Sequence, residues 1–283
     1  MRHSHRYIHR GFYETLRELG RDVIWVDDQI ENQELVKSGD ILITVGIQCK
    51  YLPIKPNVHY VLHNVPSEIS ENIKSHVKLQ VFTRDAYGVR IDETISLWSE
   101  GDRTLYQPWG IPEPSNYWLP PSIKPSNHEN WVGSVWNNTL NQGNKEEISK
   151  YASLLRQRGI KFKKMGGTRT YSREGLSSLK SFKKVNESTI GAAIVGRWQQ
   201  ESGYVPCRAF KNVAAGAIPI SNSNFTNVFG DSYLFAGNLE NLIEIARDIN
   251  PLEFKERSEN CKEVLDKYSY KSGLNRIIST LFN

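Results

Sequence analysis

The stretch that decides the fold is GYVPCRAFKNVAAGAIPISN, residues 203–222, in which a short helical pattern lies between a proline and a glycine. Pro206 suits the first turn of a helix, because the N–H that proline lacks would have no partner there. Gly216 is of the residue type that ends helices, and the apolar run after it predicts a buried strand. The stretch therefore predicts a helix that begins near Pro206 and returns the chain to a sheet.

The beginning of this helix is suited to an anion. Backbone N–H groups from Val205 to Arg208 belong to the first turn, where the helix dipole favours negative charge. Arg208 adds a planar guanidinium with several donors, which matches phosphate oxygens. The same residues also fit an amphipathic helix whose Phe210 and Val213 pack on a sheet. On these residues alone, a packing helix and a phosphate-binding turn both stay open.

Apolar segments alternate with helical patterns along the rest of the chain. Five segments rich in β-branched or aromatic residues predict buried parallel strands at 22–28, 40–46, 58–64, 78–85 and 104–110. Further strands are predicted at 130–135, 160–167, 189–196 and in AIPIS and SYLFAG, with helices at 144–159 and 173–186. We expect Trp25 to pack inside the first strand. The pattern predicts an α/β protein of two Rossmann-like domains facing across a cleft, the default binding site.

Prolines mark the joint between the two domains. Residues 111–128 hold five prolines and little periodicity, so they form neither a long helix nor a central strand. We expect an N-terminal domain at 1–115, a linker at 116–128 and a second domain at 129–265. A C-terminal helix at 266–283 is expected to pack back on the N-terminal domain.

Composition excludes several classes of protein. Three cysteines spread over 283 residues indicate neither a disulfide framework nor a four-thiolate zinc site. The sequence contains no apolar run that predicts a membrane helix and begins without a signal peptide pattern, so we expect a cytoplasmic protein. The net charge of +5 comes from scattered lysines, which favours a small phosphate-bearing partner over a nucleic acid.

A family resemblance sharpens these predictions. Residues 203–222, preceded by IGAAIVG and followed by NVFGDSYLFAGNLENLIEIARDI, resemble the donor-binding half of GT-B glycosyltransferases. The similar group has a proline or hydroxyl residue and a basic residue before an A-x-G-x-x-P turn, and includes exostosin-like, fucosyltransferase-like and spore-protein-like members. The resemblance covers about residues 129–283, and the first half resembles the family in architecture only. It implies a UDP- or GDP-linked sugar as donor substrate, a glycan or other hydroxyl acceptor, and no separate cofactor.

The resemblance also implies roles by position. It makes 1–115 the acceptor domain and 129–265 the nucleotide-sugar domain. The family's first strand is expected to be absent, displaced or lost to the choice of start site, which leaves open a reduced first sheet. At the donor it implies, for the diphosphate, Tyr204, Val205, Pro206, Arg208, Gly133 and Ser134, and for the base or a further phosphate, Gly166, Gly167 and Arg169. Trp198 precedes the phosphate turn and is a candidate to stack on a sugar or base, although core packing is the ordinary role of a tryptophan. Lys211 stands where many retaining members have a ribose-binding glutamate, so the ribose contact stays unassigned.

The predicted chemistry needs no metal ion. Arg208 and the helix start would stabilise the leaving nucleoside diphosphate. The sequence has no D-x-D pair beside a predicted strand end that would hold a divalent cation, and the nearest candidate is VDD at 26–28. We therefore expect metal-independent transfer.

The acceptor side has weaker candidates. An inverting enzyme needs a general base, and His63 and Asp85 each follow a predicted strand, where such residues also serve simply as turn caps. His5 and His9, four residues apart, are candidates for contacts at the cleft. That spacing also fits two metal ligands, but the sequence nearby offers no third ligand.

These features predict a glycosyltransferase, a hexosyl- or pentosyltransferase of glycan biosynthesis. The alternative is a catalytically silent nucleotide- or sugar-binding module of the same fold. The first hydrolyses a UDP- or GDP-sugar even without acceptor, and the second binds it without turnover. A binder of phosphate polymers would instead lose affinity steeply with salt, and the sequence has no contiguous basic stripe to support it.

Overall fold

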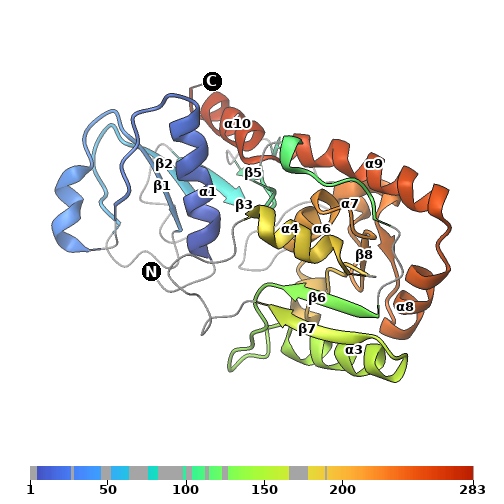
Figure 1. Cartoon of the computed structure of the whole chain (residues 1–283). Coiled ribbons are helices and arrows are strands. Elements are labelled where there is room, and N and C mark those ends of the chain that lie inside the picture. The colour runs from blue at the N-terminus through green and yellow to red at the C-terminus, as the bar shows by residue number, and fades with distance from the viewer. Residues whose placement is uncertain are drawn as a thin grey trace. The chain divides into compact units, whose positions relative to one another are not determined.

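The chain divides into two compact units. The structure is a computed structural model that describes residues 5–26, 29–45, 52–63, 76–81, 98–99, 104–111, 115–122, 127–165, 178–188 and 190–282. The first unit comprises His5–Pro108 together with Tyr270–Asn283, and the second comprises Trp109–Ser269 (Figure 1). Each unit has its own sheet and its own helices.

The first unit is built on a mainly parallel sheet. Its strands are β1 (Ile41–Val45), β2 (His59–His63), β3 (His76–Gln80), β4 (Trp98–Ser99) and β5 (Thr104–Tyr106), in the order β1-β2-β3-β5-β4. Only β4 runs antiparallel. Val45 is paired with His63, and His63 with Leu79, so the carboxyl ends of the first three strands share one edge. Four of the five strands predicted before residue 111 are thereby confirmed.

The predicted strand at 22–28 is wrong for its described part. Residues 21–26 form no regular strand, and the first strand of the unit is β1. Trp25 is 41% exposed rather than packed in a core. Its ring contacts Tyr13 of the first helix edge-on, with centroids 5.8 Å apart. Within the described residues, no strand pairs with this segment. Its β-branched residues therefore give it a strand propensity without a strand.

Two helices from opposite ends of the chain cover this sheet. They are α1 (His5–Glu18) and α10 (Tyr270–Phe282), which lie beside each other (Figure 1), while η1 (Ile30–Leu35) is a 3₁₀ helix. Phe12 of α1 stacks on Tyr270 with ring centroids 4.4 Å apart. Arg276 Nη2 donates a 2.6 Å hydrogen bond to Gln107 Oε1. The last helix of the chain is thus part of the first unit.

The second unit has two parallel sheets of two strands each, and the buried segment 190–195 contacts both. β6 (His128–Val132) pairs with β7 (Lys161–Met165), and β8 (Ile220–Ser221) pairs with β9 (Leu234–Phe235). Residues 190–195 are buried and reach β8, because Ala193 N–H donates to Ile220 O at 2.9 Å. The strand predicted at 189–196 has no regular strand geometry in its described residues, and a hydrogen bond links the Ala192 N–H to the Glu129 side chain of β6.

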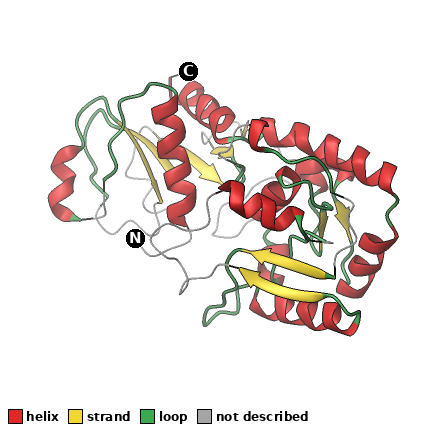
Figure 2. Cartoon of the chain, viewed as in Figure 1, coloured by secondary structure: helices red, strands yellow, loops and turns green. Residues whose placement is uncertain are grey.

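Helices lie on both faces of the sheet formed by β6 and β7 (Figure 2). The bounds are η3 (Ser115–Tyr117), α3 (Lys145–Gln157), α4 (Ser178–Asn186), α5 (Arg197–Glu201), α6 (Cys207–Ala214), α7 (Thr226–Phe229), η4 (Gly230–Ser232), α8 (Leu239–Asp248) and α9 (Pro251–Lys267). Alternate residues of β6 face opposite layers. Trp131 joins the core formed with α3 and α8, whereas Asn130 Nδ2 donates to Lys184 O of α4 at 2.7 Å. Within the described ranges, no helix combines the length and apolar character needed to cross a membrane.

The helix α6 has the bounds that the deciding stretch predicts. Pro206 is its N-cap, with φ −73° and ψ 151°. At the other end Gly216 takes φ +69°, which favours glycine. Gly216 N–H donates to Val213 O, and Ala217 N–H to Asn212 O, both at 2.9 Å. These two bonds form a Schellman motif and lead the chain into β8.

We predict that Gly216→Ala destabilises the second unit more than Gly159→Ala does. Gly159 ends α3 in the same motif, with φ +75° and nothing within 4 Å of an added Cβ, so alanine there costs only backbone strain, about 1–2 kcal/mol. At Gly216 the added Cβ would also collide with the backbone oxygen of Pro120. Urea unfolding of both variants measures the difference. Equal losses would contradict this role of the Pro120 contact.

Candidate functional site

The predicted anion site is organised around Arg208, the second residue of α6. Its Nη1 donates a 2.5 Å hydrogen bond to Val132 O, the last carbonyl of β6. Its Cζ lies 3.4 Å from the centroid of the Trp131 ring. Gly133 has φ +143°, and a Cβ there would collide with Arg208 Nη2. The guanidinium therefore lies at the carboxyl end of β6, in space that a side chain at residue 133 would fill.

The loop after β6 is fixed to neighbouring parts of the same edge. Gly133 N–H donates to Met165 O at the end of β7, at 3.1 Å. Asn144, the N-cap of α3, donates from Nδ2 to Ser134 O at 3.3 Å. The structure thus brings the predicted residues Gly133 and Arg208 into contact, with Ser134 next in the chain. This is the edge where parallel α/β sheets bind ligands.

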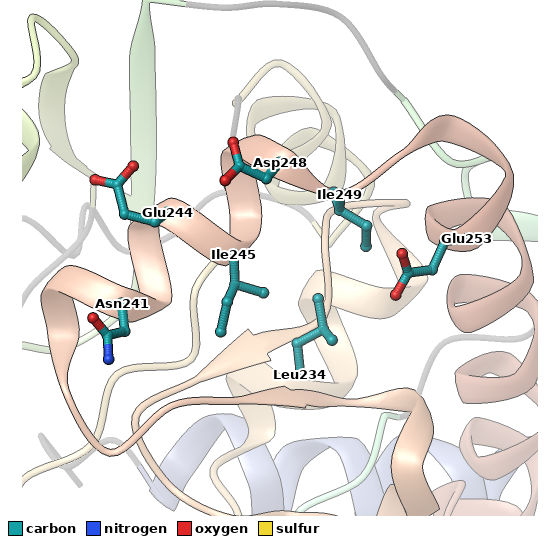
Figure 3. Close-up of a pocket in the computed structure, with 7 residues that line it drawn as sticks. All are labelled: Leu234, Asn241, Glu244, Ile245, Asp248, Ile249 and Glu253. Carbon is teal, nitrogen blue, oxygen red and sulfur yellow. The ribbon is translucent and has the colours of Figure 1, made fainter.

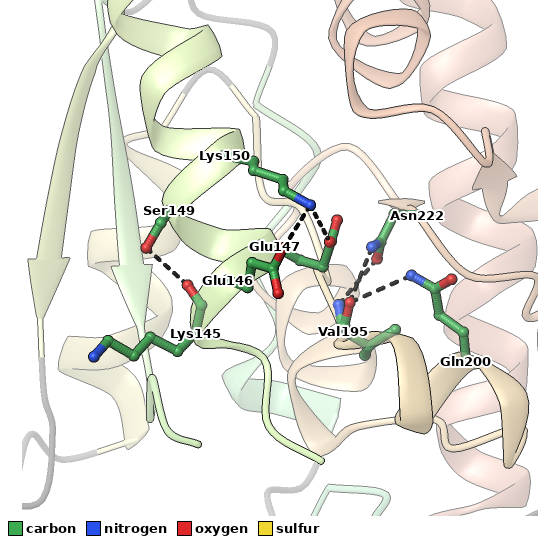
Figure 4. Close-up of polar contacts among 8 residues, drawn as sticks. All are labelled: Lys145, Glu146, Glu147, Ser149, Lys150, Val195, Gln200 and Asn222. Carbon is green, nitrogen blue, oxygen red and sulfur yellow. Dashed lines mark hydrogen bonds and ion pairs between the residues drawn. The ribbon is translucent and has the colours of Figure 1, made fainter. Parts of the chain in front are cut away.

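Asparagine and glutamine side chains hold the end of the segment 190–195. Val195 N–H donates to Asn222 Oδ1, and Asn222 Nδ2 donates back to Val195 O, both at 2.9 Å (Figure 4). Gln200 Nε2 also donates to Val195 O, at 3.4 Å. Near the start of α3, Lys150 pairs with Glu146 and Glu147 of the first turn, at 2.9 and 3.1 Å (Figure 4). Asn222 and Gln200 thus fix the end of the segment 190–195.

A fully buried carboxyl group, Glu129, lies two residues before Trp131 on β6. Tyr151 of α3 donates its hydroxyl to Glu129 Oε2 at 2.7 Å. Burial raises the pKa of Glu129 to about 8, and the hydrogen bonds from Tyr151 and Ala192 and the charge of Arg208 oppose that rise. Glu129 was not among the residues predicted for the site, although a glutamate directly before the strand predicted at 130–135 was a visible signal.

We predict that Glu129→Gln removes a loss of stability with rising pH. The folded-state pKa lies near 8 and the ordinary pKa of the group is 4.5, so the folded protein binds the proton more tightly between these values. Stability therefore falls from about pH 4.5 to about pH 8, by an amount on the order of 3–5 kcal/mol, and is constant above. The substituted glutamine is neutral throughout, and the variant should match the wild type near pH 5 and exceed it near pH 8.5. Urea titrations across this range measure both slopes.

The exposed Glu240→Gln is the matched control, and it should keep the wild-type slope. A Glu129→Gln protein whose stability still falls between pH 5 and 8 as steeply as the wild type would contradict the assignment.

The other residues predicted for the donor site differ in burial, and some lie outside the described residues. Val205 is buried, while Tyr204 and Pro206 are partly buried beside Arg208 in the chain. Trp198 is the second residue of α5 and is partly buried. Lys211 belongs to the last turn of α6, a turn beyond the helix start. Gly166, Gly167 and Arg169, and Asp85 on the acceptor side, lie outside the described residues.

In the first unit the structure brings together two histidines predicted for the acceptor side. His63 ends β2 at the carboxyl edge and is 1% exposed. His9 of α1 lies beside it, with ring centroids 6.1 Å apart. Burial lowers the pKa of His9 to about 4, so His9 is neutral at pH 7. His5 is the first residue of α1. Among the described residues, no three His, Cys, Asp or Glu side chains gather as metal ligands, and metal independence stays a prediction.

A hollow of about 480 Å³ lies elsewhere in the second unit, along α8 and β9 (Figure 3). It is lined by Leu234, Asn241, Glu244, Ile245, Asp248, Ile249 and Glu253. None of these residues belongs to the group around Arg208. Three of them carry carboxylates, which would repel a diphosphate. The chemistry of this hollow therefore does not match the predicted donor.

Comparisons with known proteins bear on the fold. A scan of the sequence against protein-family models finds no match, and a search of curated proteins finds none either. Among solved structures, the apo structure of OtsA is similar with a TM-score of 0.54 and 14% identity, over 98% of this chain and 77% of that chain. A trehalose-6-phosphate synthase, studied for glycosyl transfer with retention, is similar with a TM-score of 0.53 and 14% identity, over 97% of this chain and 78% of that chain. Both have the GT-B fold, so the fold predicted from the sequence is confirmed.

Proposed function

We propose that the GT-B fold of this chain serves a glycosyltransferase, which transfers a sugar from a UDP- or GDP-sugar to a hydroxyl group of a glycan or similar acceptor without a metal ion. The observation that supports this most is Arg208, fixed at the carboxyl end of β6 and at the start of α6. A guanidinium and a helix start at the binding edge of a parallel sheet are what a leaving diphosphate requires.

The magnitudes assign most of the affinity for the diphosphate to hydrogen bonds and Arg208 rather than to the helix dipole. A helix dipole contributes about 0.3–1 kcal/mol to a nearby charge at an exposed site. A hydrogen bond to a charged group contributes about 1.5–3 kcal/mol, and a guanidinium can form two with one phosphate. The positive charge of Arg208 would compensate the charge that grows on the leaving group. We therefore propose transfer that needs no divalent cation.

On the acceptor side we propose His63 as the base that takes the proton of the acceptor hydroxyl. It lies at the carboxyl edge of the first sheet, where α/β proteins bind ligands, and its neighbour His9 is uncharged at neutral pH. A neutral neighbour exerts none of the repulsion on His63 that a second imidazolium would exert. A sugar transferred with retention would instead assign His63 to binding the acceptor hydroxyl.

We predict that Arg208→Ala weakens UDP or GDP binding about 10- to 100-fold, because a charged hydrogen-bond donor is lost. The measurement is a thermal-shift panel of UDP, GDP, dTDP and CMP, in which a ligand at 100 times its Kd stabilises by about 2.7 kcal/mol. Arg197→Ala is the matched control, since that side chain is 89% exposed and pairs with Glu201. An Arg208→Ala protein that responds like the wild type would refute the site.

The same panel with a chelator tests the metal requirement, and we expect an unchanged response. Incubation with the matching nucleotide sugar then separates enzyme from binding module. A glycosyltransferase releases the nucleoside diphosphate slowly without acceptor, whereas a silent module binds the donor and releases none.

We predict that His63→Ala lowers kcat about 10²- to 10⁴-fold, the usual contribution of a general base, and leaves the Kd of the donor nucleotide unchanged. His59→Ala is the control, because His59 begins the same strand and its ring packs on Phe282, with centroids 5.0 Å apart. Donor hydrolysis and acceptor transfer measured side by side report kcat. Equal losses of kcat in both variants would indicate a structural effect and remove His63 from the mechanism.

A further inference from the structure

Trp131 has a property that core packing does not account for. It is 1% exposed and belongs to the core formed with α3 and α8. Within the described part of the chain its indole Nε1 has no hydrogen-bond partner. A buried donor without an acceptor lowers stability, whereas a phenylalanine would fill most of the same space without that cost. The tryptophan therefore has a compensating interaction elsewhere on its ring.

That interaction is the stack with Arg208. The guanidinium carbon lies 3.4 Å from the ring centroid, well within the range of a cation–π contact, and tryptophan has the most favourable ring for it. The next two residues of the chain complete the binding position of the guanidinium. Val132 O accepts a hydrogen bond from Nη1, and Gly133 leaves the space that Nη2 occupies. Three successive residues thus define one position for a long side chain.

We propose that Trp131 and Gly133 are positioning residues that hold the Arg208 guanidinium ready for the diphosphate of the donor. The inference rests on the proposed function and deepens it, because it names how the binding group is fixed. An arginine side chain that is ordered before binding loses less conformational entropy when the phosphate arrives. Donor affinity then depends on the Trp131 ring and on the absence of a Cβ at Gly133, although neither residue needs to touch the donor.

The test combines Trp131→Phe and Gly133→Ala with Arg208→Ala in double-mutant cycles. Isothermal titration calorimetry measures the Kd of UDP and GDP, with uridine and guanosine as ligands that lack phosphates. We expect each single variant to bind the diphosphate about 3- to 30-fold more weakly, the range of a cation–π contact. Binding of the nucleoside should not change. In the Arg208→Ala background neither substitution should weaken the diphosphate further.

Unfolding measurements separate positioning from packing. Trp131→Phe removes the donor without an acceptor, but it also leaves a void in the core and weakens the stack with Arg208, so its unfolding temperature is measured first and binding is compared well below it. Gly133→Ala lies in the loop after β6, outside the core cluster, and keeps the test available if the core variant is unstable. Its φ of +143° also strains a residue with a Cβ, and a loss of affinity from that strain would persist in the Arg208→Ala background. Trp25→Phe, at an exposed site of the first unit, is the control for loss of a tryptophan.

Each result decides one proposal. If Arg208→Ala binds the diphosphate normally, or the wild type binds none, the proposed function fails. If Arg208→Ala weakens binding but Trp131→Phe and Gly133→Ala do not, the positioning inference alone fails. The positioning inference also fails if Trp131→Phe and Gly133→Ala still weaken diphosphate binding in the Arg208→Ala background.

Discussion

The position of one guanidinium, at the carboxyl end of β6, is the constraint on which the account of this protein depends. Arg208 comes from α6, yet its contacts are with Trp131, Val132 and Gly133 of another element. This arrangement requires that α6 begin at Pro206 and that the chain after β6 lack a Cβ. The same contacts join a helix start to a sheet edge, which makes the edge chemically suited to an anion.

Glu129 gives the region beneath this site an unusual electrostatic character. A carboxyl group in the core loses hydration, and the bonds from Tyr151 and Ala192 compensate only in part. The pKa near 8 means that Glu129 is mostly protonated at neutral pH, so this carboxyl group does not neutralise the charge of Arg208. The same side chain bonds the Ala192 N–H of the irregular segment 190–195. Glu129 thus links β6 to this segment.

The sequence predicted the parts of the structure that local patterns determine. Apolar strands, the Pro206 start and the Gly216 end of α6 were all visible in short windows. Two Rossmann-like domains followed from their order, and the GT-B fold from the family resemblance of residues 129–283. Trp25 was mispredicted because burial depends on which strands pair, and no local signal reports the absence of a partner. Three contacts join residues that lie far apart in the sequence. They are the stack of Arg208 on Trp131, the hydrogen bonds to the Glu129 carboxyl and the His9–His63 pair. Such contacts exist only in three dimensions.

The most direct measurement of the central claim is a crystal structure of the protein with the nucleoside diphosphate that stabilises it most. The account predicts phosphate oxygens within hydrogen-bond distance of Arg208 and of the backbone N–H groups at the start of α6, with the guanidinium still stacked on Trp131. A diphosphate bound elsewhere, for example at the hollow along α8, with Arg208 contacting protein groups alone, would contradict it.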